Sequence, residues 1–262
     1  MKISETIEKA RFAGRSVLIC YLPAGFPTKK KSIKAILALA NSGADIIEIG
    51  LPYSDPVMDG PVIQAATNTA LENGFKIRDL FEIISEVTKK TSVPIAVMSY
   101  WNPIVQYGVE RFAEDLVKAG GVGIITPDLI PDEANDWLQV SKHFGLERIF
   151  LAAPTSSAER LKRIAAESTG FVYAVSTMGI TGERNDLDAA AKGVVSGLRA
   201  AGAENVCVGI GVSTREQVLE ISEYADGAIV GSHLVKTLEN GGISKLKNAT
   251  KDLKTALTNR VV

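Results

Sequence analysis

DIIEIGLPYSDPVMDGP, residues 45–61, begins as a short β-branched strand that ends at a glycine and continues as a loop punctuated by prolines. Strands of this kind, apolar on both faces, are typical of a parallel sheet buried between helices. Two carboxylates do not fit a purely structural explanation. Glu48 interrupts the apolar strand, where an unpaired carboxylate is costly to bury, and Asp59 lies on the stiff loop. The pair indicates acid–base chemistry at a strand's end.

Seven other segments resemble this strand, and each is followed by a predicted helix. The eight predicted strands span residues 17–22, 45–50, 93–99, 122–126, 148–152, 171–175, 205–208 and 227–230. Eight such units in 262 residues fit a closed barrel better than a doubly wound sheet. The sequence therefore predicts an α/β fold, a single (β/α)8 (TIM) barrel domain over residues 1–262. An extra N-terminal helix and extended loops after strands 2 and 6 are expected.

The extra helix, predicted over residues 4–13, precedes the first strand. It is amphipathic, and its apolar side chains Ile7, Ala10 and Phe12 are available for packing. We expect this helix to close the bottom of the barrel. A single helix is also predicted over residues 132–144.

The composition excludes several classes of protein. Net charge is −1, and the longest basic run is Lys29-Lys30-Lys31, so nucleic acid is not an expected partner. The chain begins with a charged amphipathic segment and has no run of 18 apolar residues, so neither a signal peptide nor a membrane span is expected. Cys20 and Cys207 fall in strands and are predicted to be buried free thiols. A cytoplasmic location is expected.

Glycines after the last strands indicate a phosphate site. Gly211 follows the seventh predicted strand, Gly231-Ser232 follow the eighth, and Gly182 lies in the loop after the sixth. Backbone N–H groups at helix N-termini bind phosphate where no side chain intervenes, and in barrels the loops after strands 7 and 8 often do so. Each glycine could instead only close a tight turn, but the three together favour phosphate.

Glu48 lies on the same strand face as Ile46, and no other predicted strand contains a lysine or arginine except Arg148, which begins its strand. We therefore expect Glu48 to lack a permanent partner and to have a raised pKa. The alternative is that Glu48 is a barrel-interior carboxylate paired with a buried lysine or arginine. Asp59 could be a turn residue in an Asp-Gly pair, and Asp55 and Asp128 are better explained as turn or capping residues.

Other chemistries are disfavoured by the residues present. His143 and His233 have no ligands at metal spacing, no nucleophile–histidine set can be assembled, and no strand-end lysine is available for a Schiff base. Aromatic residues that could line a pocket for a flat apolar group lie at or after strand ends: Tyr21, Phe26, Tyr53, Tyr100, Trp101 and Tyr173. These features indicate a lyase or isomerase acting on a phosphorylated metabolite, without a metal or a cofactor.

Seven motifs in order carry a resemblance over essentially the whole chain: YLPAGFP, GADIIEIGLPYSDPVMDGPVIQAA, YWNPI, TPDLIPDEA, GITGER, VGIGVSTREQV and GAIVGSHLVK. The chain resembles the tryptophan synthase alpha subunit family, and the second motif is the most specific. The resemblance implies a lyase that cleaves indole-3-glycerol phosphate to indole and glyceraldehyde 3-phosphate. It also implies channelling of indole to a beta subunit that carries pyridoxal phosphate, within an alpha2-beta2 heterotetramer.

The resemblance also implies roles for individual residues. Glu48 would be the acid and base at indole C3 and the glycerol hydroxyl, and Asp59 would bind the indole N–H. Thr181 would reach Asp59 from a closing loop. Residues expected at the indole pocket are Tyr21, Tyr100 and Tyr173, those at the phosphate are Gly182, Gly211, Gly231 and Ser232, and those facing the beta subunit are Asp55, Pro56, Asn102 and Pro103.

The chain departs from the family pattern at Thr177-Met178 in the sixth loop and at Ile210, where an aromatic residue often stands. Two alternatives remain open at this point. One is a related phosphate-binding barrel, such as an isomerase or decarboxylating synthase of the same pathway. Such an enzyme would need a catalytic lysine or paired aspartates at other strand ends. The other is a barrel that keeps the ligand site but acts mainly as an allosteric partner of a synthase.

Overall fold

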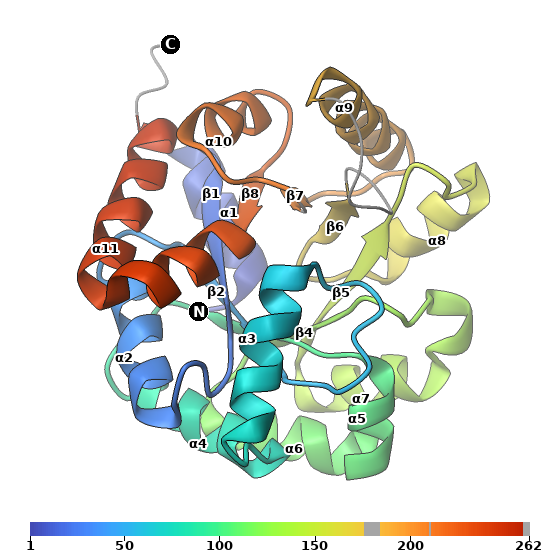
Figure 1. Ribbon diagram of the computed structural model, residues 1–262. Coiled ribbons are helices and arrows are strands. Elements are labelled where there is room, and N and C mark those ends of the chain that lie inside the picture. Colours follow the sequence, from blue (N-terminus) through green and yellow to red (C-terminus); the bar gives the residue numbers. More distant parts are fainter. Residues whose placement is uncertain (176–183, 210, 259–262) are drawn as a thin grey trace.

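The computed structural model describes residues 1–175, 184–209 and 211–258, and in it eight parallel strands close into a barrel in sequence order (Figure 1). The strands are β1 (Val17–Pro23), β2 (Ile46–Gly50), β3 (Ile95–Met98), β4 (Gly123–Thr126), β5 (Glu147–Ala152), β6 (Val172–Val175), β7 (Val206–Gly209) and β8 (Gly227–Val230). β1 pairs with β8, which closes the ring. The predicted (β/α)8 barrel is confirmed.

Helices cover the barrel, and most of them lie around its outside (Figure 1). They are α1 (Ile3–Phe12), α2 (Lys29–Ala40), α3 (Pro61–Glu72), α4 (Ile77–Thr88), α5 (Trp101–Tyr107), α6 (Val109–Ala119), the 3-10 helix η1 (Pro131–Glu133), α7 (Asn135–Phe144), α8 (Ala158–Glu167), α9 (Arg184–Ala200), α10 (Arg215–Ser222) and α11 (Ser232–Thr258). Within α11 the chain kinks at Gly242, whose φ of 64° favours glycine. None of the helices in these ranges is long and apolar enough to cross a membrane.

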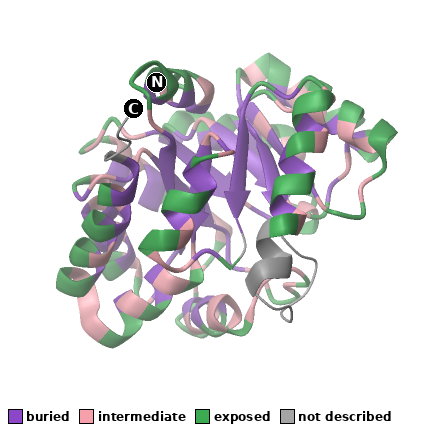
Figure 2. Cartoon of the chain, turned by 90° about the horizontal axis from the view of Figure 1, so that it is seen from above, coloured by how far each residue is buried: buried purple, intermediate pink, exposed green. Residues whose placement is uncertain are grey.

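The strands are buried on both faces, which explains their apolar runs (Figure 2). Outward side chains such as Ile47 and Ile49 pack with the helices, whereas Ile19, Ile46 and Ile125 fill the interior. The free thiols of Cys20 and Cys207 are buried, as predicted.

Helix α1 closes the bottom of the barrel, as expected, but one of its predicted contacts is wrong. Ile3, Ile7 and Ala10 pack into the interior cluster, whereas Phe12 is 91% exposed. Ile3, Ile7 and Ala10 follow the i, i+4, i+7 spacing of one helix face, and Phe12 lies off that face. The buried carboxylate of Glu147 at the start of β5 accepts bonds from the N–H of Ile3 at 2.6 Å and of Ser4 at 3.1 Å.

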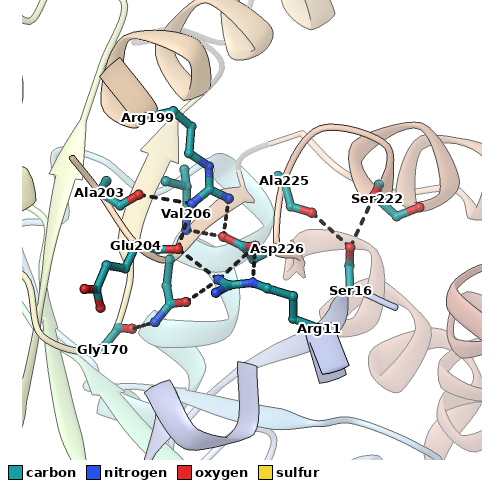
Figure 3. Close-up of polar contacts among 11 residues, drawn as sticks. Arg11, Ser16, Gly170, Arg199, Ala203, Glu204, Val206, Ser222, Ala225 and Asp226 are labelled. Atoms are coloured by element: carbon teal, nitrogen blue, oxygen red, sulfur yellow. Dashed lines mark hydrogen bonds and ion pairs between the residues drawn. The ribbon is translucent and has the colours of Figure 1, made fainter. Parts of the chain in front are cut away.

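A second carboxylate organises the same end of the barrel. Asp226, just before β8, accepts a 2.7 Å hydrogen bond from the N–H of Val206 and forms ion pairs with Arg11 of α1 and Arg199 of α9 (Figure 3). The Asp226 side chain is only 11% exposed. This contact set joins α1, α9, β7 and β8 at the N-terminal ends of the strands, opposite the end where barrel enzymes place their active sites.

Two helical predictions need correction. The segment predicted as one helix over residues 132–144 is divided into η1 and α7, because Ala134 between them has φ −94° and ψ 15°, outside the α-helical range. Helix α5 was not predicted. It has seven residues and contains Pro103 in its first turn, so it carries little periodic signal.

Candidate active site

The carboxyl group of Glu48 points into the barrel from β2. It is 1% exposed, and its Oε2 atom has no hydrogen-bond partner within the described ranges. Burial, and then the nearby charge of Asp59, raise the Glu48 pKa to about 8. The expectation of a raised pKa therefore agrees with the geometry, and at neutral pH Glu48 is largely protonated.

Asp59 is held on the loop between β2 and α3 by two anchors. The Gln64 side chain of α3 donates to the Asp59 carbonyl at 2.7 Å, and the Met58 N–H donates to the Tyr100 hydroxyl at 2.8 Å. Burial raises the Asp59 pKa to about 6, although a hydrogen bond with the Tyr100 side chain acts in the opposite direction. Asp59 is therefore mostly ionised at neutral pH, unlike Glu48.

Two tyrosines stand against glycines at the strand ends. A Cβ atom on Gly50 would lie 2.2 Å from the Tyr21 hydroxyl, and one on Gly209 would lie 2.1 Å from the Tyr173 hydroxyl. Both rings are 6% exposed. Burial raises the pKa of each phenol, and the charges of Glu48 and Asp59 add to the effect. The four side chains therefore belong to one electrostatic cluster, and this arrangement requires glycine at 50 and 209.

Three of the predicted phosphate residues, Gly211, Gly231 and Ser232, lie at the same end of the barrel. Gly211 follows β7, has φ +84° and has open space at its Cβ position. Gly231 and Ser232 follow β8 at the start of α11, and a Cβ atom on Gly231 would be 3.3 Å from the Tyr21 ring. Thr181, Gly182, Thr177-Met178 and Ile210 lie outside the described residues.

The residues predicted to face a partner differ in burial. Asp55 and Asn102 are exposed and Pro56 is partly exposed, but Pro103 is buried within the chain. Pro103 therefore has almost no surface to offer a partner, because it lies with Ile104 on the buried face of α5. Asn102 donates to the Tyr53 hydroxyl at 3.0 Å, and the Tyr53 and Tyr100 ring centroids are 5.5 Å apart.

Three contacts of the site were missed by the sequence reasoning, although it did expect Asp128 to act as a turn or capping residue. Gln64 anchors Asp59, the Tyr100 hydroxyl anchors Met58, and Asp128 caps α5 through the N–H of Trp101. Only Gln64 had a usable signal, because it lies in the first turns of a helix that follows a stiff loop. The other two contacts join segments from different strand–helix units, which periodicity cannot relate.

The arrangement can donate one proton and stabilise one positive charge. Two neighbouring carboxyl groups with separated pKa values provide an acid and an anion at the same pH. The surrounding tyrosine rings provide flat apolar surfaces. Among the residues that the structure covers, no group of three histidine, cysteine, aspartate or glutamate side chains could hold a metal ion.

Comparisons with known proteins show which family the chain resembles in sequence and in fold. The family described as "Tryptophan synthase alpha chain" matches residues 7–261. The tryptophan synthase alpha chain of Leifsonia xyli subsp. xyli is 57% identical over 93% of this chain and 93% of its own length. The fold superposes on a Mycobacterium tuberculosis tryptophan synthase structure with a TM-score of 0.92, at 45% identity over 97% of each chain. A chain of the tryptophan synthase complex from Pyrococcus furiosus gives a TM-score of 0.82, at 36% identity over 91% of this chain and 98% of its own.

Proposed function

The chain belongs to the tryptophan synthase alpha chain family, a family of lyases, and we propose that Glu48 and Asp59 carry its cleavage of indole-3-glycerol phosphate to indole and glyceraldehyde 3-phosphate. One observation carries the assignment of roles. Two carboxyl groups of one site have pKa values of about 8 and about 6, so that at neutral pH one is an acid and the other an anion.

Glu48 supplies the proton. The bond between indole C3 and the glycerol chain breaks only once C3 has gained a proton and the ring nitrogen carries positive charge. Protonated Glu48 gives its proton to C3 and becomes a carboxylate. That carboxylate then accepts the proton of the adjacent glycerol hydroxyl, the carbon–carbon bond electrons return to the ring, and the hydroxyl carbon becomes the aldehyde. Glu48 ends the cycle protonated.

Asp59 stabilises the intermediate. Its carboxylate accepts a hydrogen bond from the indole N–H and offsets the positive charge that forms on the nitrogen. The anchors from Gln64 and Tyr100 hold the backbone of the loop that carries this carboxylate, so little reorganisation is needed when substrate arrives. Thr181, on the loop after β6, is proposed to meet Asp59 when that loop closes over substrate.

The substrate's phosphate is proposed to bind at the same end of the barrel, beside the ends of β7 and β8. The backbone N–H groups near Gly211, Gly231 and Ser232 suit a dianion at the start of α10 and α11. Gly182 is proposed as a further phosphate residue. Tyr21 lies beside Gly231 and shares the cluster with Tyr173 and Tyr100, so the indole ring would lie between these aromatic side chains.

We further propose that the chain works with a beta subunit, since the similar Pyrococcus furiosus chain belongs to a tryptophan synthase complex. Asp55, Pro56 and Asn102 form the proposed contact surface. The subunit would receive indole by channelling and carry pyridoxal phosphate as its own cofactor, in an alpha2-beta2 assembly in the cytoplasm. Because partner binding would bias the site toward its closed form, activity should rise in the complex.

Indole release from indole-3-glycerol phosphate tests the roles. Glu48→Gln and Asp59→Asn keep the size of each side chain and remove its acid or charge, so each should lower kcat by roughly 100-fold or more. Calorimetry should show that both variants still bind substrate. Near-normal indole release by either variant would contradict its assigned role. Binding without cleavage by the unmodified chain, alone and with the beta subunit, would instead support the allosteric alternative.

A separate experiment tests the partner surface. Asp55→Ala combined with Asn102→Ala should weaken assembly with the beta subunit, measured by analytical ultracentrifugation, while intrinsic cleavage by the isolated chain stays within a few-fold of normal. Assembly at unchanged affinity would remove these residues from the interface.

A further inference from the structure

Helix α5 begins immediately beyond the site, and its first turn is held from outside its own strand–helix unit. The N–H of Trp101 donates to both carboxylate oxygens of Asp128, at 2.9 and 3.1 Å. Asp128 follows β4, whereas α5 follows β3. A carboxylate at a helix N-terminus pairs with an otherwise unpaired backbone donor and with the positive end of the helix dipole.

Tyr100 lies between this cap and the loop that carries Asp59. It is the residue before Trp101, and Ser99 donates a 2.8 Å bond to its carbonyl. The Tyr100 ring is 5% exposed, so its position follows that of its backbone. At the far end of the ring, its hydroxyl accepts the Met58 N–H at 2.8 Å and contacts the Asp59 carboxylate.

These contacts form one continuous path from an exposed carboxylate to a catalytic one. Asp128 fixes the first turn of α5, the turn fixes Tyr100, and Tyr100 fixes the loop that presents Asp59. A loss of the cap would let the first turn fray, because helix ends without partners for their N–H groups are weakly held. The tyrosine would then no longer hold the Asp59 loop in one place.

We infer that Asp128 is a positioning residue for the cleavage reaction, acting through Tyr100 on Asp59 without touching substrate. The inference rests on the proposed role of Asp59 in indole release. It assigns Asp128 a function in catalysis in addition to its function as a helix cap.

Kinetics of three variants test the inference in the full chain. Asp128→Ala should lower kcat about fivefold, the size expected from losing one helix cap, with a smaller change in KM. Asp128→Asn keeps an oxygen that can accept the Trp101 N–H and should restore most of this loss. Asp79→Ala is the matched control, since Asp79 caps α4 through the Lys76 N–H at 2.8 Å, and it should leave kcat unchanged.

A double variant separates positioning from a general loss of stability. Asp128→Ala in a Tyr100→Phe background should cause little further loss of kcat, because the path is already broken at the hydroxyl. Multiplicative effects of the two substitutions would overturn the inference. So would a loss of kcat in Asp128→Ala that Asp128→Asn does not restore.

Titration of the ligand-free chain gives a reading that does not depend on catalysis. The titratable groups around Asp59 are Glu48, Tyr21 and Tyr173, together with Tyr100, which is hydrogen-bonded to it. Carboxylate NMR should show a higher Asp59 pKa in Asp128→Ala than in the unmodified chain, because the bond from Tyr100 favours the ionised form. An unchanged titration would overturn the inference. Failure of the unmodified chain to release indole would overturn the proposed function alone.

Discussion

The ring of Tyr21 lies so close to Gly50 that a Cβ atom at position 50 would come within 2.2 Å of the tyrosine hydroxyl. The two residues are on the neighbouring strands β1 and β2, and Gly50 lies two residues beyond Glu48, the register partner of Tyr21. Tyr173 and Gly209 repeat the relationship on β6 and β7, at 2.1 Å. Two walls of the proposed indole pocket therefore depend on glycine at the end of the next strand.

Gly50→Ala should displace the Tyr21 ring and lower kcat/KM for indole release by roughly 10- to 100-fold, because a shift of about 1 Å in a positioned site has effects of this size. Overpacking should also lower stability by about 1–3 kcal/mol. Kinetics and thermal unfolding of the same preparation measure both effects.

The matched control for this substitution is Gly193→Ala. Gly193 lies in α9 with open space at its Cβ position, so alanine should leave kcat/KM unchanged and add up to about 1 kcal/mol of stability through helix propensity. Full activity in Gly50→Ala would show that the Tyr21 ring can move without consequence for the site.

The pH dependence of kcat/KM should be bell-shaped. Activity should rise as Asp59 ionises near its pKa of about 6 and fall as Glu48 loses its proton near its pKa of about 8. In Asp59→Asn the residual activity should lose the acidic limb and keep the alkaline one. A single limb in the unmodified chain would contradict the division of roles.

Glu48 should also make folding stability depend on pH. Its folded pKa is raised from 4.5 to about 8, so the folded chain binds the proton more tightly than the unfolded chain does. The stability associated with Glu48 is then fully present below about pH 4.5 and is lost as pH rises toward 8. Glu48→Gln removes this dependence. The gain in its free energy of unfolding over the unmodified chain should therefore grow with pH, to a few kcal/mol by pH 8. Chemical denaturation at pH 5 and pH 8 measures the difference, and a gain that is equal at both would contradict a raised Glu48 pKa.

Sequence patterns identified the parts of the fold that repeat. Each strand is a short apolar run ended by a loop, so the barrel could be predicted from eight independent segments. Glu48 was identifiable for the same reason, since a carboxylate stands out within an apolar run. Phe12 was misjudged because a ten-residue helix has few turns, and its buried face is defined by only Ile3, Ile7 and Ala10.

Contacts between different strand–helix units could not be predicted from such patterns. Helix α5 is stabilised by Asp128, which is 27 residues from Trp101 in the sequence. The position of Asp59 likewise depends on Tyr100, which lies beyond α3, α4 and β3. Such contacts arise only once the barrel brings adjacent strand ends together, and no local periodicity encodes them.

At the opposite end of the barrel, Asp226 joins Arg11, Arg199 and the Val206 N–H. Asp226→Ala leaves a buried donor and two guanidinium groups without their common partner, so stability should fall by about 2–4 kcal/mol. Asp226→Asn can still accept the Val206 N–H and should lose less. Denaturant unfolding measures both. Indole release per folded molecule should remain within about twofold of normal, because the proposed site lies at the other ends of the strands.

Glu114→Ala is the matched control for the Asp226 series. Its carboxylate pairs with Lys118 at 2.7 Å, but the two side chains are 49% and 64% exposed. An exposed pair of this kind contributes little, so the change should stay below about 0.5 kcal/mol. An equally small effect in Asp226→Ala would show that solvent screens the Asp226 contacts as well, and the closure of the barrel bottom would then depend on the apolar packing of α1.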